Sequence, residues 1–295
     1  MDVRAPSRLA WSSTEVGGRT VKYGAGGDGL PVLFLHGWAL GNRAYKHGLN
    51  RLVSQGCRVY APAFPGFGGS AALPPHAYGL DAYAAWVNAF LDAVGEQEPV
   101  LAVGHSFGAA VAAKFAHDFP ERASQLMLVN PLGGSAWKGS GSKARTMSER
   151  PLWDWALSFP KDLLLDRRAL VTLAAIVEDA GPNLATNPLG VWRAGELARR
   201  VDLRSELAAL RRSGMPVMAV WAHGDTIIPR TSFESLCDAL GHTGRVVRGR
   251  HSWLLSDPAL FAEVMADTVA KAASARLESM SRASADGGGV TRAAG

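Results

Sequence analysis

Cysteine is scarce in this chain, and long apolar runs are absent. The 295 residues include 2 cysteines, Cys57 and Cys237, with neither CxxC spacing nor the pattern of a disulfide framework. We therefore expect both to be buried, reduced thiols. No apolar run approaches the ~18 residues of a membrane span, and residues 1–11 lack the charged start and apolar stretch of a secretory signal. These absences predict a soluble, cytoplasmic protein without a transmembrane segment.

The sequence also lacks an excess of one charge. It has 31 Lys and Arg against 26 Asp and Glu, a formal net charge of +5, and it contains no Lys/Arg block with interleaved aromatics. A mildly basic surface of this kind predicts no nucleic-acid partner. The sequence leaves a homo-oligomer open.

Two glycine-rich stretches lack the context of a nucleotide site. Gly24–Gly29 fits G-x-G-x-x-G, but the strand-like run Val32–Leu35 follows where a helix N-terminus is required. A hairpin turn is therefore favoured over a dinucleotide site. Gly68-Gly69-Ser70 lacks the Gly-Lys pair of a phosphate loop and also predicts a turn. We expect no cofactor and no metal, and a small molecule as the partner.

Short apolar runs alternate with helical patterns along most of the chain. The runs are 18–23, 31–35, 58–61, 100–103, 126–129, 216–221 and 245–247, and the helical patterns lie near 81–94, 109–117, 233–240 and 259–272. This order predicts βαβ units, and hence an α/β fold with a mostly parallel, doubly wound sheet. We assign residues 14–132 and 201–274 to this core.

Between residues 133 and 200 the pattern becomes helical, with no evident strand. Apolar residues follow the glycine-serine joint at 139–142, and prolines at 160, 182 and 188 break the helical pattern. We expect an inserted helical cap over the sheet, whose tryptophans either pack between helices or line a pocket. Residues 1–13 and 275–295 predict a flexible N-terminus and a disordered tail.

One pentapeptide carries the strongest chemical signal. Gly104-His105-Ser106-Phe107-Gly108 lies between an apolar run and a small-residue helical pattern, which is the strand, G-x-S-x-G, helix order of a nucleophile elbow. An ordinary glycine turn with an idle serine is the alternative, so partners elsewhere in the chain must decide.

A base and an acid are available in the last two loops of the sheet. A serine hydroxyl needs a base, and the base needs an orienting carboxylate. Asp225 follows the run ending at 221, and His251 follows the run ending near 248. Because parallel strands open their C-terminal loops at one edge, these residues and Ser106 are expected to converge there. Asn130 ends the strand before the insertion, but an amide cannot stabilise an imidazolium as Asp225 does.

Backbone donors for a developing oxyanion are predicted from the same loops. The N–H groups of Phe107, at the start of the helix, and of Trp38, after His36-Gly37, form the natural pair. We expect the side chains of His36, His105 and Trp253 to line the pocket.

Together these segments resemble the serine-nucleophile branch of the α/β-hydrolase superfamily, which includes esterases and lipases. The resemblance spans residues 18–272 and is carried by His36-Gly37, Pro65-Gly66-Phe67-Gly68, the Ser106 pentapeptide, Gly224-Asp225 with Pro229, and Gly249-x-His251-Ser252-Trp253. Relatives often have aspartate at the position of Ala63, so a divergent subfamily is implied. A serine at the elbow argues against the epoxide-hydrolase and haloalkane-dehalogenase branches.

The sequence therefore predicts a carboxylic-ester hydrolase acting on a lipophilic acyl group. The same residues also suit C–C bond hydrolysis or cofactor-free perhydrolysis. A ligand-binding protein that keeps the pocket without turnover is a further alternative.

Overall fold

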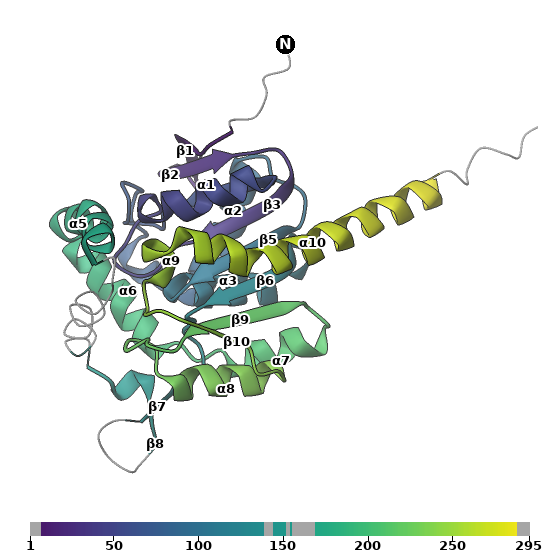
Figure 1. Cartoon of the computed structure of the whole chain (residues 1–295). Coiled ribbons are helices and arrows are strands. Elements are labelled where there is room, and N and C mark those ends of the chain that lie inside the picture. Colours follow the sequence, from purple (N-terminus) through teal and green to yellow (C-terminus); the bar gives the residue numbers. More distant parts are fainter. Residues whose placement is uncertain (1–6, 139–143, 152–153, 155–168, 288–295) are drawn as a thin grey trace, which may run out of the picture.

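An eight-stranded sheet forms the centre of the computed structural model, which describes residues 7–138, 144–151, 154 and 169–287 (Figure 1). The strands lie in the order β1 (Ala10–Val16), β2 (Arg19–Gly26), β4 (Cys57–Pro62), β3 (Leu30–Leu35), β5 (Val100–His105), β6 (Ala123–Val129), β9 (Val217–Ala222) and β10 (Arg245–Val247). β1 and β2 pair antiparallel, as do β2 and β4, and the remaining pairs are parallel. The predicted mostly parallel sheet is confirmed.

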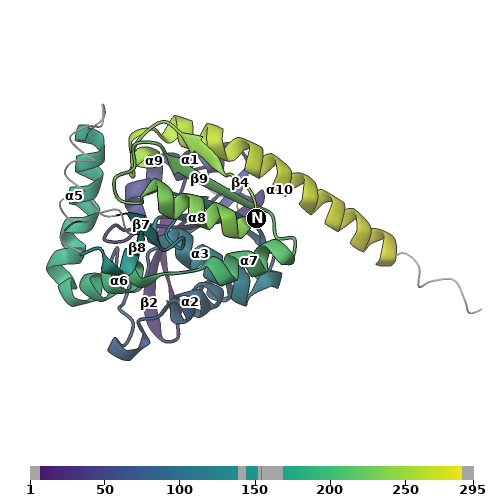
Figure 2. The ribbon, with the colours of Figure 1, turned by 90° about the horizontal axis from the view of Figure 1, so that it is seen from below.

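Helices cover both faces of the sheet. One hydrophobic core lies between the sheet and four helices: α2 (Leu80–Ala93), α3 (Phe107–Asp118), α7 (Arg204–Arg212) and α8 (Arg230–Leu240). A second hydrophobic core lies between the other face of the sheet and α1 (Lys46–Ser54), α9 (Trp253–Ser256) and α10 (Pro258–Gly287). Figure 2 shows α1, α9 and α10 along one side and α2, α3 and α7 along the other. Within β3, Leu33 and Leu35 enter the first core while Val32 and Phe34 enter the second, because successive side chains of a strand point to opposite faces.

The inserted segment contributes helices and a small hairpin. Helices α5 (Ala169–Thr186) and α6 (Pro188–Arg200) fulfil part of the expected helical pattern, and the rest of it lies outside the described residues. β7 (Ala136–Lys138) and β8 (Ala144–Thr146) pair antiparallel, so the expectation of no strand was wrong. Strands of this length carry too little periodicity to detect. Pro182 lies inside α5 instead of ending it, and Pro188 begins α6, where its missing N–H costs nothing.

The predicted hairpin at Gly24–Gly29 was wrong. β4 lies between β2 and β3, so these strands, adjacent in sequence, do not pair. Gly26 belongs to β2, and a Cβ there would lie 2.7 Å from the carbonyl oxygen of Arg8. This glycine therefore permits a close approach of two chain segments.

Both ends of the chain hold more regular structure than expected. β1 begins at Ala10, inside the predicted flexible N-terminus, because it pairs along its length with β2. α10 continues to Gly287, so the disordered tail was wrong for residues 275–287. Alanine, arginine and glutamate favour a helix there, and Arg276 bonds to Glu98 at 2.7 Å. Figure 1 shows this helix extending past the sheet. Residues 1–6 and 288–295 lie outside the described residues.

The structure also bears on the expectations for the two cysteines and for a membrane-spanning helix. Cys57 and Cys237 are unpaired and buried, and burial raises the pKa of each thiol to about 11. Among the described residues, no helix combines the length and apolar composition needed to cross a bilayer.

Candidate active site

Ser106 occupies a sharp turn between β5 and α3. Its backbone has φ 55° and ψ −114°, an unfavourable region for a residue with a side chain. Gly104 and Gly108 allow this turn, since an added Cβ would lie 2.3 Å from the carbonyl oxygen of Gly108 in the first case and 2.2 Å from that of Leu35 in the second. The predicted strand, elbow and helix are all present.

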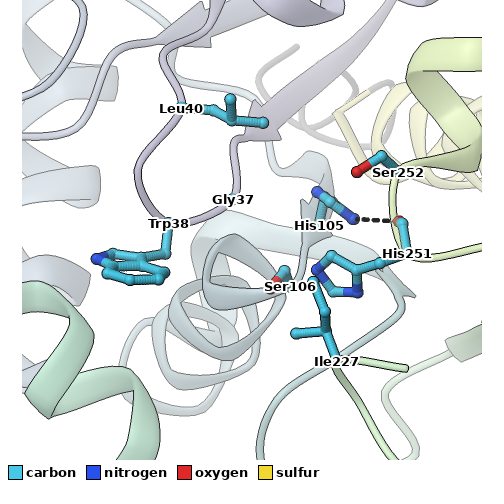
Figure 3. Close-up of a pocket in the computed structure, with 8 residues that line it drawn as sticks. All are labelled: Gly37, Trp38, Leu40, His105, Ser106, Ile227, His251 and Ser252. Carbon is cyan, nitrogen blue, oxygen red and sulfur yellow. Dashed lines mark hydrogen bonds between the residues drawn. The ribbon is translucent and has the colours of Figure 1, made fainter. Parts of the chain in front are cut away.

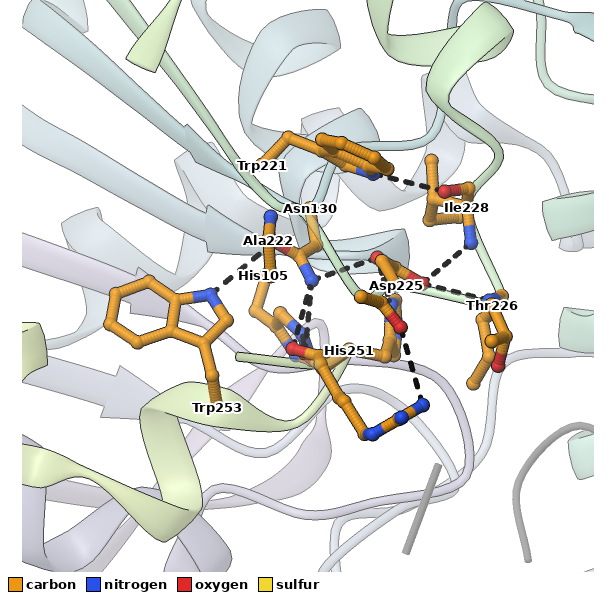
Figure 4. Close-up of polar contacts among 12 residues, drawn as sticks. His105, Asn130, Trp221, Ala222, Asp225, Thr226, Ile228, His251 and Trp253 are labelled. Atoms are coloured by element: carbon orange, nitrogen blue, oxygen red, sulfur yellow. Dashed lines mark hydrogen bonds and ion pairs between the residues drawn. The ribbon is translucent and has the colours of Figure 1, made fainter. Parts of the chain in front are cut away.

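Asp225 and His251 meet at the C-terminal ends of β9 and β10. The Nδ1 of His251 donates to Oδ2 of Asp225 at 2.8 Å, and both side chains are buried (Figure 4). Oδ1 of Asp225 accepts from the backbone N–H groups of Ile227 and Ile228, each at 2.8 Å. Because Nδ1 carries the proton, Nε2 of His251 holds the lone pair that a base requires.

Ser106 and His251 line one cavity, with about 20 Å³ of internal space (Figure 3). The remaining lining residues are Gly37, Trp38, Leu40, His105, Ile227 and Ser252. In Figure 3 the side chain of Ser106 lies beside the imidazole of His251. The structure thus brings together three residues that are far apart in sequence.

His105 lines this cavity and also supports its walls. Its Nε2–H donates to the backbone carbonyl of His251 at 3.0 Å, and its Nδ1 accepts from the hydroxyl of Tyr45 at 2.8 Å. The same hydroxyl accepts from the N–H of Gly37 at 3.1 Å. Burial lowers the pKa of His105 well below 6.5, so the ring stays neutral, as this pattern requires.

Two predicted pocket residues occupy other places. His36 lies behind the described lining: its Nε2 accepts from the N–H of Phe64, and its Nδ1 donates to the carbonyl of Gly37, each at 2.8 Å. Burial lowers its pKa to about 4. Trp253 packs against Phe261, 6.2 Å between ring centroids, and its indole is part of the core. Both predictions of pocket lining were therefore wrong, because these rings satisfy their polar groups inside the fold.

Asn130 connects the acid, the base and the sheet. Its Nδ2 donates to Oδ2 of Asp225 at 2.8 Å and to the carbonyl of His251 at 3.1 Å. Its Oδ1 accepts from the N–H of Ala222 at 3.1 Å and from the indole of Trp253 at 3.3 Å (Figure 4). This role was not predicted from the sequence, where the available signal is a polar residue at the end of a buried strand.

The two expected oxyanion donors lie in the elbow and the β3 loop. Phe107 is the first residue of α3, so its N–H has no acceptor within the helix and lies at the positive end of the helix dipole. Trp38 lines the cavity, and its indole N–H donates to the carbonyl of Val191 in α6 at 2.8 Å.

Comparison with known proteins shows which families this chain resembles. A family model described as alpha/beta hydrolase fold matches residues 31–173. The chain is 28% identical over 250 residues to a pimeloyl-[acyl-carrier protein] methyl ester esterase of Aeromonas hydrophila subsp. hydrophila, covering 81% of this chain and 95% of that one. It is 26% identical to a 2-hydroxymuconate semialdehyde hydrolase of Pseudomonas sp. strain CF600, covering 85% and 90%.

A solved structure agrees on the fold. A thermophilic esterase from Thermogutta terrifontis superposes with a TM-score of 0.71 at 19% identity, covering 89% of this chain and 99% of that one. With the doubly wound sheet and the family model that matches residues 31–173, this likeness leads to one conclusion: the chain has the α/β-hydrolase fold.

Proposed function

We propose that this protein is a serine hydrolase that cleaves carboxylic esters through an acyl-enzyme. The observation that carries the proposal is the buried His251–Asp225 hydrogen bond of 2.8 Å at the cavity that Ser106 lines. The similarity to a methyl ester esterase supports the same reaction class.

Each residue has a defined role in this reaction. Nε2 of His251 takes the hydroxyl proton of Ser106 as Oγ bonds to the ester carbonyl carbon, and Asp225 stabilises the imidazolium that forms. Collapse of the tetrahedral intermediate breaks the bond to the alcohol oxygen, which receives the proton from His251. Water then repeats the sequence on the acyl-enzyme and releases the acid and free Ser106.

The oxyanion would accept from the backbone N–H groups of Trp38 and Phe107. Loss of one such donor typically costs ~100 to ~1000 fold in turnover. The Phe107 amide also aims the α3 dipole at the developing negative charge.

The cavity lining favours a short, lipophilic acyl group. Leu40 and Ile227 contribute apolar side chains to the lining of the cavity. The space of about 20 Å³ holds roughly one water-sized group, so a long acyl chain requires side chains to move. Short acyl groups should therefore react faster than long ones.

A panel of p-nitrophenyl esters, from acetate to octanoate, tests this function. Turnover above that of Ser106→Ala, greatest for the shortest esters, is the expected result. If no chain length is turned over faster than by the variant, the esterase proposal is rejected.

Carbon–carbon bond hydrolysis is the second candidate, favoured by the similarity to the semialdehyde hydrolase. A dienol diketone cleaved while p-nitrophenyl esters remain intact would support it. A fluorophosphonate probe that labels Ser106 readily would count against a purely ligand-binding role, since labelling requires an activated hydroxyl.

A further inference from the structure

Four residues of α5, α6 and the junction between them bond to loops of the core: Asp179, Asn183, Asn187 and Val191. Asp179 and Asn183 lie four positions apart in α5 and so share one face of that helix, whereas Asn187 caps α6 and Val191 lies within it. α5 contacts the short helix η1 (Arg43–Tyr45), which follows the Trp38 loop, residues 36–42.

Asp179 binds the backbone of the loop after Trp38. Its Oδ2 accepts from the N–H of Gly41 at 3.0 Å and from that of Ala44 at 2.8 Å. Asp179 is 7% exposed, and its carboxylate lies so close that a Cβ on Gly41 would be 3.0 Å from Oδ1. A buried carboxylate is costly unless hydrogen-bonded, and burial does raise its pKa. Its acceptor oxygen thus holds one amide of this loop and one of η1 at once.

Asn183 binds the same loop one step nearer to Trp38. Its Nδ2 donates to the carbonyl of Ala39 at 3.0 Å, and its Oδ1 accepts from the N–H of Gly68 at 2.8 Å. Ala39 has φ 66°, a region that non-glycine residues rarely adopt without support. The side chain of Asn183 therefore holds a strained residue directly after the proposed oxyanion donor.

The other two residues, Asn187 and Val191, also bond to core loops. Nδ2 of Asn187 donates to the carbonyl of Gly66 at 3.2 Å, and the carbonyl of Val191 accepts from the Trp38 indole at 2.8 Å. The Trp38 ring packs so closely on α6 that a Cβ on Gly195 would lie 2.8 Å from it. The cap therefore holds both the Trp38 side chain and the backbone that follows Trp38.

We propose that Asp179 and Asn183 are positioning residues that hold the Trp38 backbone N–H in the oxyanion hole. The cap then contributes to catalysis by fixing the position of an oxyanion donor. This inference rests on the proposed function, which assigns that amide to the oxyanion. A small displacement suffices to matter, because a misplacement of about 1 Å can cost ~100 fold in rate.

The labelling rate of Ser106 by a fluorophosphonate probe tests the proposal without a known substrate. Asp179→Ala removes the oxygen that accepts both hydrogen bonds, whereas Asp179→Asn keeps one oxygen able to accept. We expect labelling to slow about tenfold or more in Asp179→Ala, and the Asn variant to recover part of the rate. Asn183→Ala should slow it independently. Glu178→Gln is the matched control on the same helix, since Glu178 is 72% exposed at its side chain.

Circular dichroism and thermal unfolding define a temperature at which every variant is folded. The affinity of each variant for a boronic acid is the second measurement. The boronate adduct places an oxygen where the oxyanion forms, so its affinity should fall in parallel with labelling in the two alanine variants. If wild-type Ser106 is not labelled, the proposed function fails and this inference fails with it. If wild type is labelled and Asp179→Ala and Asn183→Ala match it, or Glu178→Gln slows equally, only the role of the cap is overturned.

Discussion

The imidazole of His105 donates to the backbone carbonyl of His251 at 3.0 Å, so the residue before the proposed nucleophile holds the loop of the proposed base. The hydroxyl of Tyr45 extends this connection to Gly37, next to the proposed oxyanion donor Trp38. One buried chain of hydrogen bonds thus links both loops that flank Ser106.

Tyr45→Phe should disconnect these two loops. The change removes the hydroxyl but keeps the ring, which packs on Phe34 with 4.8 Å between centroids. It leaves His105 Nδ1 and the Gly37 amide without this partner, so we expect a loss of ~1–3 kcal/mol in unfolding free energy and a lower kcat. Urea unfolding measures the loss of stability, and ester kinetics measure kcat. Tyr78→Phe, at a half-exposed position, is the control, and equal behaviour of the two variants would disprove the link.

Asn130→Gly should remove the side-chain amide of Asn130 without straining the backbone at this position. Glycine tolerates the φ of 45° at this position, so only the side-chain hydrogen bonds are lost. Because Asp225 and His251 lose a shared donor, we expect kcat to fall more than KM rises, with about 1–3 kcal/mol less stability. A wild-type kcat in the folded variant would show that Asn130 does not position the pair.

Stability should decrease as the pH falls from about 6.5 toward 4. The folded-state pKa of His36 is about 4, below the ~6.5 of an exposed imidazole. In this interval the unfolded chain binds a proton that the folded chain excludes, so unfolding becomes easier by about 3 kcal/mol for His36 at pH 4. Burial of neutral His105 acts in the same direction.

Urea unfolding across this pH range measures the slope. His36→Gln removes one titrating group and should flatten it, whereas His47→Gln, on the exposed surface, should not. A slope unchanged by His36→Gln would contradict the assignment.

Gly108→Ala should damage the elbow even though it lies in a helix. An added Cβ would lie 2.2 Å from the carbonyl oxygen of Leu35, so α3 must move away from β3. We expect more than ~2 kcal/mol of destabilisation and loss of Ser106 labelling. Gly181→Ala in α5 is the control, since no atom of the described residues lies within 4 Å of its Cβ. It should add ~0.5–1 kcal/mol through helix propensity. Normal labelling of Gly108→Ala would refute the steric argument.

The sequence by itself determined the elements and the chemistry whose signals are local. The G-x-S-x-G between an apolar run and a helical pattern specified the elbow at Ser106, because only glycines fit against the crossing strand and helix. The loops of Asp225 and His251 followed from the strand order, since parallel strands open at one edge.

Only the tertiary structure decided what supports those groups and where weak elements form. β1 exists because β2 pairs with it. His36 and Trp253 turn inward because the N–H of Phe64 and the side chain of Asn130 satisfy the polar atoms of their rings. The bonds from Asn130 to His251 and from Asp179 to Gly41 join residues more than a hundred positions apart. Periodicity reports the neighbours along one helix or strand, whereas such contacts depend on how the elements pack, so no local pattern contains them.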